Sequence, residues 1–208
     1  MSLNLHDALV AGLAELGLDL SEAQIRQLLD YLALIQKWNK VYNLTAVRDP
    51  AEMLTHHLLD SLAVIRPLRQ QLQGRAPTDG QGFRLLDVGA GAGLPGVVIA
   101  ICCPDVAVTC VDTVAKKATF IQQAAIALKL PNLKGLHARV ENLVDRFDVV
   151  SSRAFSSAGF RYLVARGAGP GRRLAGHEWQ APGGRVGSPA RWGGGVSRGT
   201  AFGAWVGG

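Results

Sequence analysis

The sequence predicts an α/β fold in which a parallel sheet is covered by helices and preceded by a helical extension. Three observations support this prediction. Residues 84–151 alternate short apolar runs with helix-like runs, in the order β-α-β-α-β-(short α)-β. Such alternation is typical of parallel strands joined by crossover helices. Glycines at positions 89, 91, 93 and 96 separate the first strand from the first helix, and Asp112 ends the second strand.

Residues 1–72 are predicted to form the helical extension. Leucines at helical spacing predict a first helix within residues 3–18. Ser21 and Gln24 form a capping box that starts a second helix, whose apolar stripe ends at Asn39. We expect the polar and aromatic segment from Trp38 to Thr45 to leave that helix. Asp49 and Pro50 then start a third helix, which ends near residue 71.

A core over residues 84–156 follows a glycine-containing linker at 73–82. Its predicted strands cover 84–88, 106–111, 133–138 and 147–151, its helices 97–101 and 116–130, and a loop and turn 139–142. Ligands of such sheets bind outside the carboxyl ends of the strands. We therefore expect the functional site at that edge.

The glycine turn favours a nucleotide-like ligand, but G-x-G-x-x-G alone does not identify it. Asp112 has the spacing of an acid that binds two ribose hydroxyls. Asp87 directly precedes the glycines, where dinucleotide folds usually have an apolar residue. A carboxylate there suits the cationic sulfonium and ammonium groups of S-adenosylmethionine (SAM). SAM binding is therefore favoured over NAD binding.

The amino-acid composition limits the cellular compartments and the binding partners that we expect. Cys102, Cys103 and Cys110 lie in apolar runs and are interpreted as buried thiols, which fits a reducing, cytoplasmic setting. Acids interrupt the first twenty residues, so no signal peptide is expected, and no apolar run is long enough for a membrane helix. Residues 1–158 carry no net charge, and seven arginines with one acid in residues 159–208 account for the value of +6. The net charge therefore gives no argument for nucleic-acid binding by the core.

Residues 157–208 differ in character from the rest of the chain. Residues 159–208 contain 15 of the 25 glycines, three of the four tryptophans and no lysine. We expect a Gly/Arg-rich tail that is read out of frame or disordered, and we expect the C-terminal part of the sheet to be missing. A genuine disordered basic tail that binds rRNA is the alternative.

Four motifs together resemble the bacterial small-subunit rRNA methyltransferase G family. They are Y-N-L-T (42–45), H-H-L-L-D-S-L (56–62), L-D-V-G-A-G-A-G-L-P-G (86–96) and S-R-A-F (152–155), and the resemblance covers about residues 10–156. It implies a class I SAM-dependent methyltransferase fold and formation of 7-methylguanosine in 16S rRNA. The implied substrate is 16S rRNA or a small ribosomal subunit precursor, and we expect a monomer with no membrane partner. The implied cofactor contacts are Gly89, Leu94, Val140, Glu141 and Arg153, and the residues themselves add Gly91 and Asp112.

Guanine N7 carries an available lone pair and no proton, so its methylation needs positioning and no general base. Arg153 is the candidate for that positioning. Methylation of a pyrimidine carbon would need a reactive cysteine, and the three thiols lie in unsuitable apolar surroundings. Two rival hypotheses are an inactive or truncated SAM- or nucleotide-binding module and an NAD-dependent oxidoreductase, although the latter lacks a proton relay after the fourth strand.

Other candidate residues have less specific interpretations. His56, His57 and Asp60 lack a third metal ligand at a suitable spacing, so we expect no metal and favour a contact that orders the cofactor loop or the RNA. Trp38, Lys40 and Tyr42 fit equally an RNA platform and a helix end packed on the sheet. Lys116 and Lys117 are interpreted as a solvated helix start.

Overall fold

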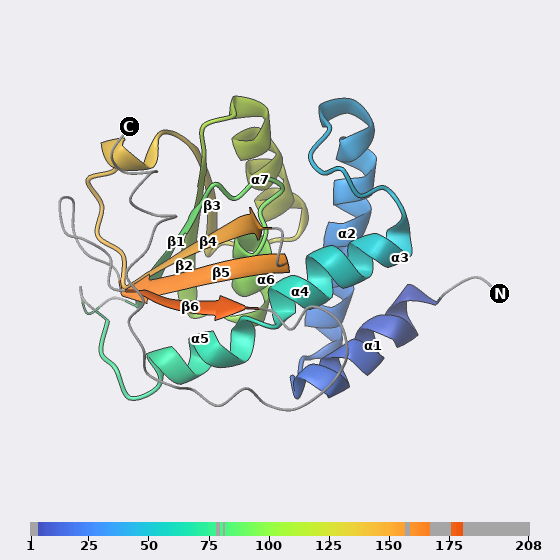
Figure 1. The fold of residues 1–208 in the computed structure, drawn as a ribbon, viewed down its shortest axis with the longest axis horizontal. Helices are drawn as coiled ribbons and strands as arrows, with labels where there is room; N and C mark the ends of the chain where they lie inside the picture. Colours follow the sequence, from blue (N-terminus) through green and yellow to red (C-terminus); the bar gives the residue numbers. More distant parts are fainter. Residues whose placement is uncertain (1–3, 78–79, 81, 157–158, 167–175, 181–208) are drawn as a thin grey trace.

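The structure, a computed structural model, describes residues 4–77, 80, 82–156, 159–166 and 176–180, with side-chain surroundings up to residue 153. The N-terminal helices lie at one side of the molecule (Figure 1). They pack against a sheet and against the two helices that connect its strands. None of the helices in the described ranges has the length and apolar character needed to cross a membrane.

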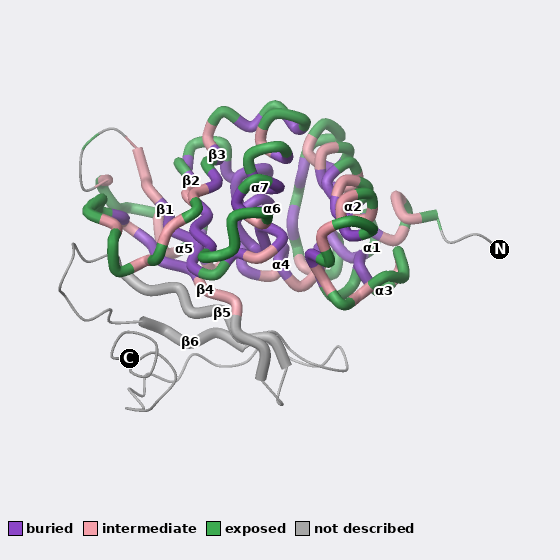
Figure 2. The backbone as a smooth tube through the Cα atoms, turned by 90° about the horizontal axis from the view of Figure 1, so that it is seen from above, coloured by how far each residue is buried: buried purple, intermediate pink, exposed green. Residues whose placement is uncertain are grey.

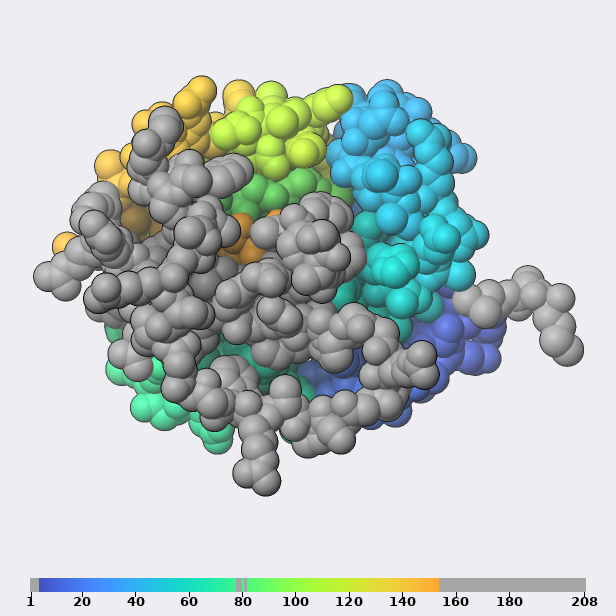
Figure 3. All heavy atoms as spheres, in the orientation of Figure 1, coloured from blue at the N-terminus to red at the C-terminus, as the bar shows by residue number. Residues whose placement is uncertain are grey.

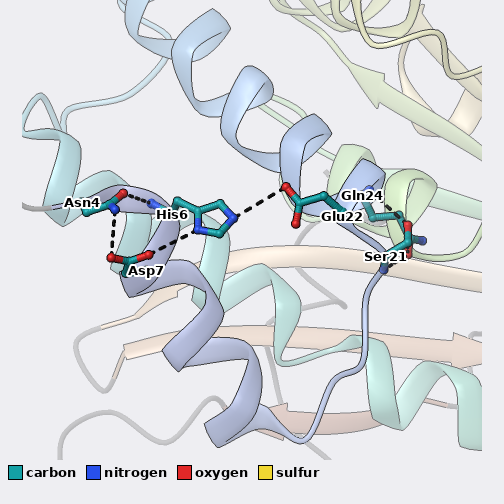
Figure 4. Close-up of polar contacts among 6 residues, drawn as sticks. All are labelled: Asn4, His6, Asp7, Ser21, Glu22 and Gln24. Carbon is teal, nitrogen blue, oxygen red and sulfur yellow. Dashed lines mark hydrogen bonds and ion pairs between the residues drawn. The ribbon is translucent and has the colours of Figure 1, made fainter.

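The first two helices begin and end as their local sequences predict. Helix α1 (Leu5–Leu16) starts at Asn4, whose side chain accepts a hydrogen bond from the His6 amide, and ends at Gly17 in the left-handed region. Helix α2 (Glu22–Tyr42) starts with the expected capping box, in which Ser21 and Gln24 bond each other's backbone amides. Figure 4 shows the His6 ring between the carboxylates of Asp7 and Glu22, so the start of α1 contacts the start of α2.

Helix α2 extends one turn further than the sequence analysis expected. The rings of Trp38 and Tyr42, four residues apart, stack with their centroids at 5.2 Å. Asn43 then ends the helix in the left-handed conformation, with its backbone amide bonded to the Asn39 carbonyl. Packing between these rings supports a helical turn that has little apolar periodicity of its own.

The third helical region is divided into short elements. Asp49 caps it and Pro50 occupies its first turn, as predicted. The H-H-L-L motif lies in a π-helical turn, and the elements are α3 (Pro50–Met53), η1 (Leu54–Leu59), α4 (Asp60–Leu62) and α5 (Ile65–Leu72). Single π turns in helices often lie at functional sites.

Four parallel strands form the sheet in the order β3-β2-β1-β4, which confirms the predicted fold class. They are β1 (Phe83–Val88), β2 (Val106–Asp112), β3 (Leu133–His137) and β4 (Val149–Ser156). The order reverses between β1 and β4, which makes this the topological switch point, where ligands of such sheets bind.

The sheet continues beyond β4, which the sequence analysis did not expect. Strand β5 (Gly159–Arg166) pairs antiparallel with β4, and β6 (Gly176–Gln180) pairs antiparallel with β5. The connection from β4 to β5 is far too short for a parallel crossover, so an antiparallel pair is the available geometry. The sequence 159–166 alternates Phe160, Tyr162 and Val164 with other residues, which is a strand period that the analysis overlooked. The other residues of the predicted tail lie outside the described residues.

Helices α6 (Gly96–Cys102) and α7 (Ala115–Ala127) pack on the parallel strands, and α2 packs against both. Buried residues lie between these layers (Figure 2). A single hydrophobic cluster includes Leu9 of α1, Leu28 of α2, Leu58 of η1 and Val108 of β2. The helical extension therefore shares its core with the sheet.

Side chains of α2 also fix its direction relative to the sheet. Gln24 and Gln27 donate to the carbonyls of Ile101 and Leu128, near the ends of α6 and α7. Trp38 instead packs edge-on against Phe120, in the middle of α7, whose first residue follows shortly after the carboxyl end of β2. Helix α2 therefore runs antiparallel to α7 and ends at the carboxyl edge of the sheet (Figure 1).

Candidate cofactor and substrate site

The glycine turn closes β1 and leaves open space at its start. Gly89 has φ 66°, which favours glycine, and a Cβ atom built there would meet no atom within 4 Å. At Gly96, by contrast, a Cβ would collide with Sγ of Cys110 and would lie 2.9 Å from Oδ2 of Asp87. Gly89 therefore leaves the carboxyl edge accessible, whereas Gly96 lets α6 approach the sheet closely.

Asp87 connects the glycine turn to β4 and is completely buried. Its Oδ2 accepts from the Gly96 amide at 2.9 Å, and its Oδ1 accepts from the Ser151 hydroxyl at 2.9 Å. Burial raises the pKa of Asp87 to about 6, although these two hydrogen bonds and the charge of Arg153 act to lower it. Both carboxylate oxygens bond protein groups and the side chain is fully buried, so Asp87 faces α6 and β4 and not the open edge where the sequence interpretation placed the cations of SAM.

Asp112 supports the turn from the end of β2. Its Oδ2 accepts from the Gly91 amide and its Oδ1 from the Val114 amide, both at 2.9 Å. Each carboxylate oxygen retains a further lone pair, so the side chain can still accept hydrogen bonds from ribose hydroxyls. Asp112 and Gly91 are thus adjacent at the carboxyl edge, as the spacing predicted.

Arg153 lies on β4 and is half-buried. Its positive charge contributes to lowering the pKa of both Asp87 and His57, so the guanidinium is electrostatically coupled to residues of two other motifs. Ser152 of the S-R-A-F motif pairs with Val88, directly before the glycine turn, so these two motifs lie side by side on the β1–β4 side of the sheet.

His57 is buried and bonds Thr45 of the Y-N-L-T motif. Its Nε2 lies 2.8 Å from Oγ1 of Thr45, and burial lowers the pKa of His57 to about 4. Asn39 accepts from the Thr45 amide and donates to the carbonyl of Val47. His57 of the H-H motif thus bonds the Y-N-L-T segment, whereas the sequence favoured a contact with the cofactor loop or the RNA.

Three predicted contacts occupy different surroundings. Leu94 is buried in the core, and its amide donates to the Ala90 carbonyl. Val140 and Glu141 form the short helix η2 (Val140–Asn142) after β3, in which Val140 packs on the second apolar cluster and Glu141 is exposed. Glu141 forms a 3.7 Å ion pair with Arg139, so a ligand would have to compete with that pair.

The structure also shows the surroundings of the proposed RNA platform, the cysteines and the possible metal ligands. Trp38 packs on Phe120 and Tyr42, whereas Lys40 lies on another side of α2, so the rings and this charge form no common platform.

The three cysteines are buried, and burial raises the pKa of Cys102 to about 12 and the pKa of Cys110 well above its usual value. These are poor surroundings for a thiolate, as predicted. Within the described ranges, no group of three or more His, Cys, Asp or Glu residues is suited to a metal.

Sequence reasoning missed two residues that organise the turn. Tyr31 of α2 is fully buried and donates its hydroxyl to the carbonyl of Ala92 at 2.7 Å. Ser151 bonds Asp87, as described above. The available signal for Tyr31 was a single polar-tipped ring within the apolar stripe of α2.

A parallel sheet with this strand order, a glycine turn after its first strand and an acid after its second defines a Rossmann-like α/β protein. A family model described as rRNA small subunit methyltransferase G (GidB) matches residues 24–164. The chain belongs to this family, which confirms the resemblance seen in its motifs.

Curated relatives named ribosomal RNA small subunit methyltransferase G agree with this assignment. The relative from Paracidovorax citrulli (strain AAC00-1) is 68% identical over 152 residues, covering 71% of this chain and 63% of the relative. The relative from Polaromonas sp. (strain JS666 / ATCC BAA-500) is 71% identical over 147 residues, covering 71% and 64%. This chain therefore spans less than two thirds of the length of both. Among solved structures, coclaurine N-methyltransferase is 12% identical with a TM-score of 0.40, covering 77% of this chain and 63% of that protein.

Proposed function

We propose that this chain binds SAM and transfers its methyl group to guanine N7 of 16S rRNA, forming 7-methylguanosine. The observation that carries the proposal is the proximity of family motifs in the fold: Thr45 of Y-N-L-T bonds His57 of the H-H motif, and Ser152 of S-R-A-F pairs with Val88, directly before the glycine turn. The family match over residues 24–164 supports the same activity.

The residues at the carboxyl edge fit SAM. Open space at Gly89 leaves room for the cofactor beside the strand end, and the remaining lone pairs of Asp112 suit its ribose hydroxyls. We assign further contacts to Gly91 and to the backbone of Leu94, Val140 and Glu141. When bound, SAM would supply an electrophilic methyl group, whose bond to sulfur breaks as the N7 lone pair forms the new C–N bond.

The protein's contribution is positioning. The N7 lone pair needs no deprotonation, so no residue has to act as a general base. Arg153 presents a planar guanidinium that can bind guanine O6 or a carboxylate, and we assign it to the junction between cofactor and base. Asp87 acts indirectly by tying α6 and β4 to the turn.

The activity test uses the chain as it stands. Calorimetry should detect binding of SAM, while NAD should show no binding. Incubation with tritiated methyl-SAM and small ribosomal subunits lacking the modification should then yield 7-methylguanosine in digested 16S rRNA. SAM binding without transfer would instead support an inactive binding module, and retention of NAD would support the oxidoreductase alternative.

We also propose a monomer acting in the cytoplasm on 16S rRNA or a precursor of the small subunit. Three buried free thiols are compatible with a reducing compartment. For residues 157–208 we retain the proposal of out-of-frame translation, supported by their glycine, arginine and tryptophan content. Resequencing the gene tests it, because an unchanged reading frame would contradict it.

A further inference from the structure

A hollow of about 240 Å³ lies between the last turns of α2 and the segment leading into α3. It is lined by Gln36, Asn39, Lys40, Arg48, Pro50 and Met53. Figure 3 shows the end of α2 and this following segment, in blue to cyan, at the molecular surface. Residues 36–40 and 48–53 thus form a shallow site that the cofactor contacts do not use.

The charged side chains that line this hollow are both positive. Lys40 and Arg48 are both exposed, and neither forms an ion pair or hydrogen bond within the described part of the chain. No acid lines the hollow. The nearest acid in sequence, Asp49, uses Oδ1 to accept from the amides of Ala51 and Glu52.

Hydrogen bonds of Asn39 bring the segments that carry the two cations together. The buried side chain of Asn39 bonds Thr45 and Val47, which fastens the segment before Arg48 onto the same turn of α2 that carries Lys40. Thr45 is in turn bonded to buried His57. Hydrogen bonds between α2, residues 45–47 and η1 therefore lie beneath the hollow.

The hollow also lies on the side of the molecule where the substrate must approach. Tyr31 of α2 bonds Ala92 in the glycine turn at the carboxyl end of β1, and the helix continues beyond that point past Phe120 in the middle of α7. The last turns of α2 therefore lie on the carboxyl side of the sheet. The Thr45–His57 bond links this segment to the H-H motif.

We propose that the Lys40–Arg48 hollow binds a backbone phosphate of the RNA substrate. A guanidinium, an ammonium and the amide of Gln36 supply the donors that suit a phosphodiester anion. Contacts of this kind fix the register of the RNA and carry no sequence information. The assignment rests on the proposed function, since it takes rRNA as the substrate.

The test compares the double variant Lys40→Gln/Arg48→Gln with the control Arg26→Gln/Lys134→Gln. The control removes the same charge from exposed positions near the start of α2 and at the start of β3, away from the hollow. Binding of 16S rRNA fragments is measured at several salt concentrations, together with SAM affinity, melting temperature and the KM and kcat of methyl transfer.

The hollow variant should raise the Kd for RNA and the KM about tenfold and reduce the salt dependence of log Kd by about 1–2, as expected for losing one or two phosphate contacts. SAM affinity, kcat and melting temperature should match the control. Equal RNA affinity and equal salt dependence in the two variants would overturn this assignment while leaving the proposed methyl transfer intact. Failure of the wild-type chain to bind RNA would overturn both the hollow and the RNA substrate, whereas SAM binding is measured separately.

Discussion

The hydroxyl of Tyr31 provides a sharp test of how the helical extension supports the glycine turn. In the Tyr31→Phe variant the ring is retained and the 2.7 Å hydrogen bond to the Ala92 carbonyl is lost. The site is completely buried, so water cannot easily replace the hydroxyl. A buried carbonyl left without its donor costs about 1–3 kcal/mol of unfolding free energy.

A cost in that range should lower the melting temperature by roughly 2–4 °C per kcal/mol for a chain of this size. We also expect SAM affinity to fall, because Ala92 lies in the turn between Gly91 and Gly93. If the less stable turn reduces the binding free energy of SAM by about 1 kcal/mol, the Kd increases roughly fivefold. Calorimetric titration with SAM and thermal unfolding measure the two effects separately.

The matched control is Gln27→Met, which removes another side-chain donor of α2 that bonds a core carbonyl. Gln27 bonds Leu128 at the far end of α7, at 2.8 Å. This variant should lose some stability, about 0.5–1.5 kcal/mol, with unchanged SAM affinity. If Tyr31→Phe is folded and binds SAM as tightly as the Gln27→Met control, the inferred support of the turn by Tyr31 is wrong.

Three further predictions concern the site. Asp112→Ala should weaken SAM binding by about 1.5–3 kcal/mol in a folded protein, since charged hydrogen bonds are lost; unchanged affinity in calorimetry would exclude the ribose contact. Arg153→Lys should reduce methyl transfer at least about tenfold, because an ammonium lacks the planar fork, and near-normal turnover would make Arg153 structural only. Burial lowers the pKa of His57 from 6.5 to about 4. The folded protein therefore resists protonation of this ring, and the free energy of unfolding falls by up to about 3 kcal/mol as the pH drops from 6.5 towards 4. Urea unfolding of the wild type and His57→Gln should therefore converge or cross on acidification, and parallel curves would refute this. The raised pKa of Asp87 has the opposite effect on the free energy of unfolding, because protonation of this buried carboxyl on acidification favours the folded state. The Asp87→Asn variant should therefore be unfolded in urea over the same pH range.

The sequence was most informative where structure depends on near neighbours. The capping box at Ser21 and Gln24 and the Asp49–Pro50 helix start were predicted correctly, because each cap involves residues within three positions. The four parallel strands followed from apolar runs and turn residues. The longer α2 was missed because its last turn depends on stacking of Trp38 with Tyr42 and on the edge of Phe120.

Candidate site residues also divide into those that local spacing predicted and those whose surroundings depend on distant parts of the chain. Asp112 could be predicted from its spacing to the glycine turn, and the structure brings it to Gly91. The burial of Asp87 could not be predicted, because it requires Ser151 from a strand 64 residues away and the close approach of α6. The continuation of the sheet through β5 likewise depends on a pairing partner, β4, although its alternating residues were visible.

By itself, the sequence determined the order of elements, the glycine turn and the family to which the chain belongs, since these reside in local spacing and residue type. Only the tertiary structure decided that Tyr31 supports the turn, that Trp38 is a packing residue and that Lys40 joins Arg48 across a hollow. The physical reason is that hydrogen bonds within a helix or turn link residues a few positions apart, whereas burial and charge depend on whatever the fold brings alongside.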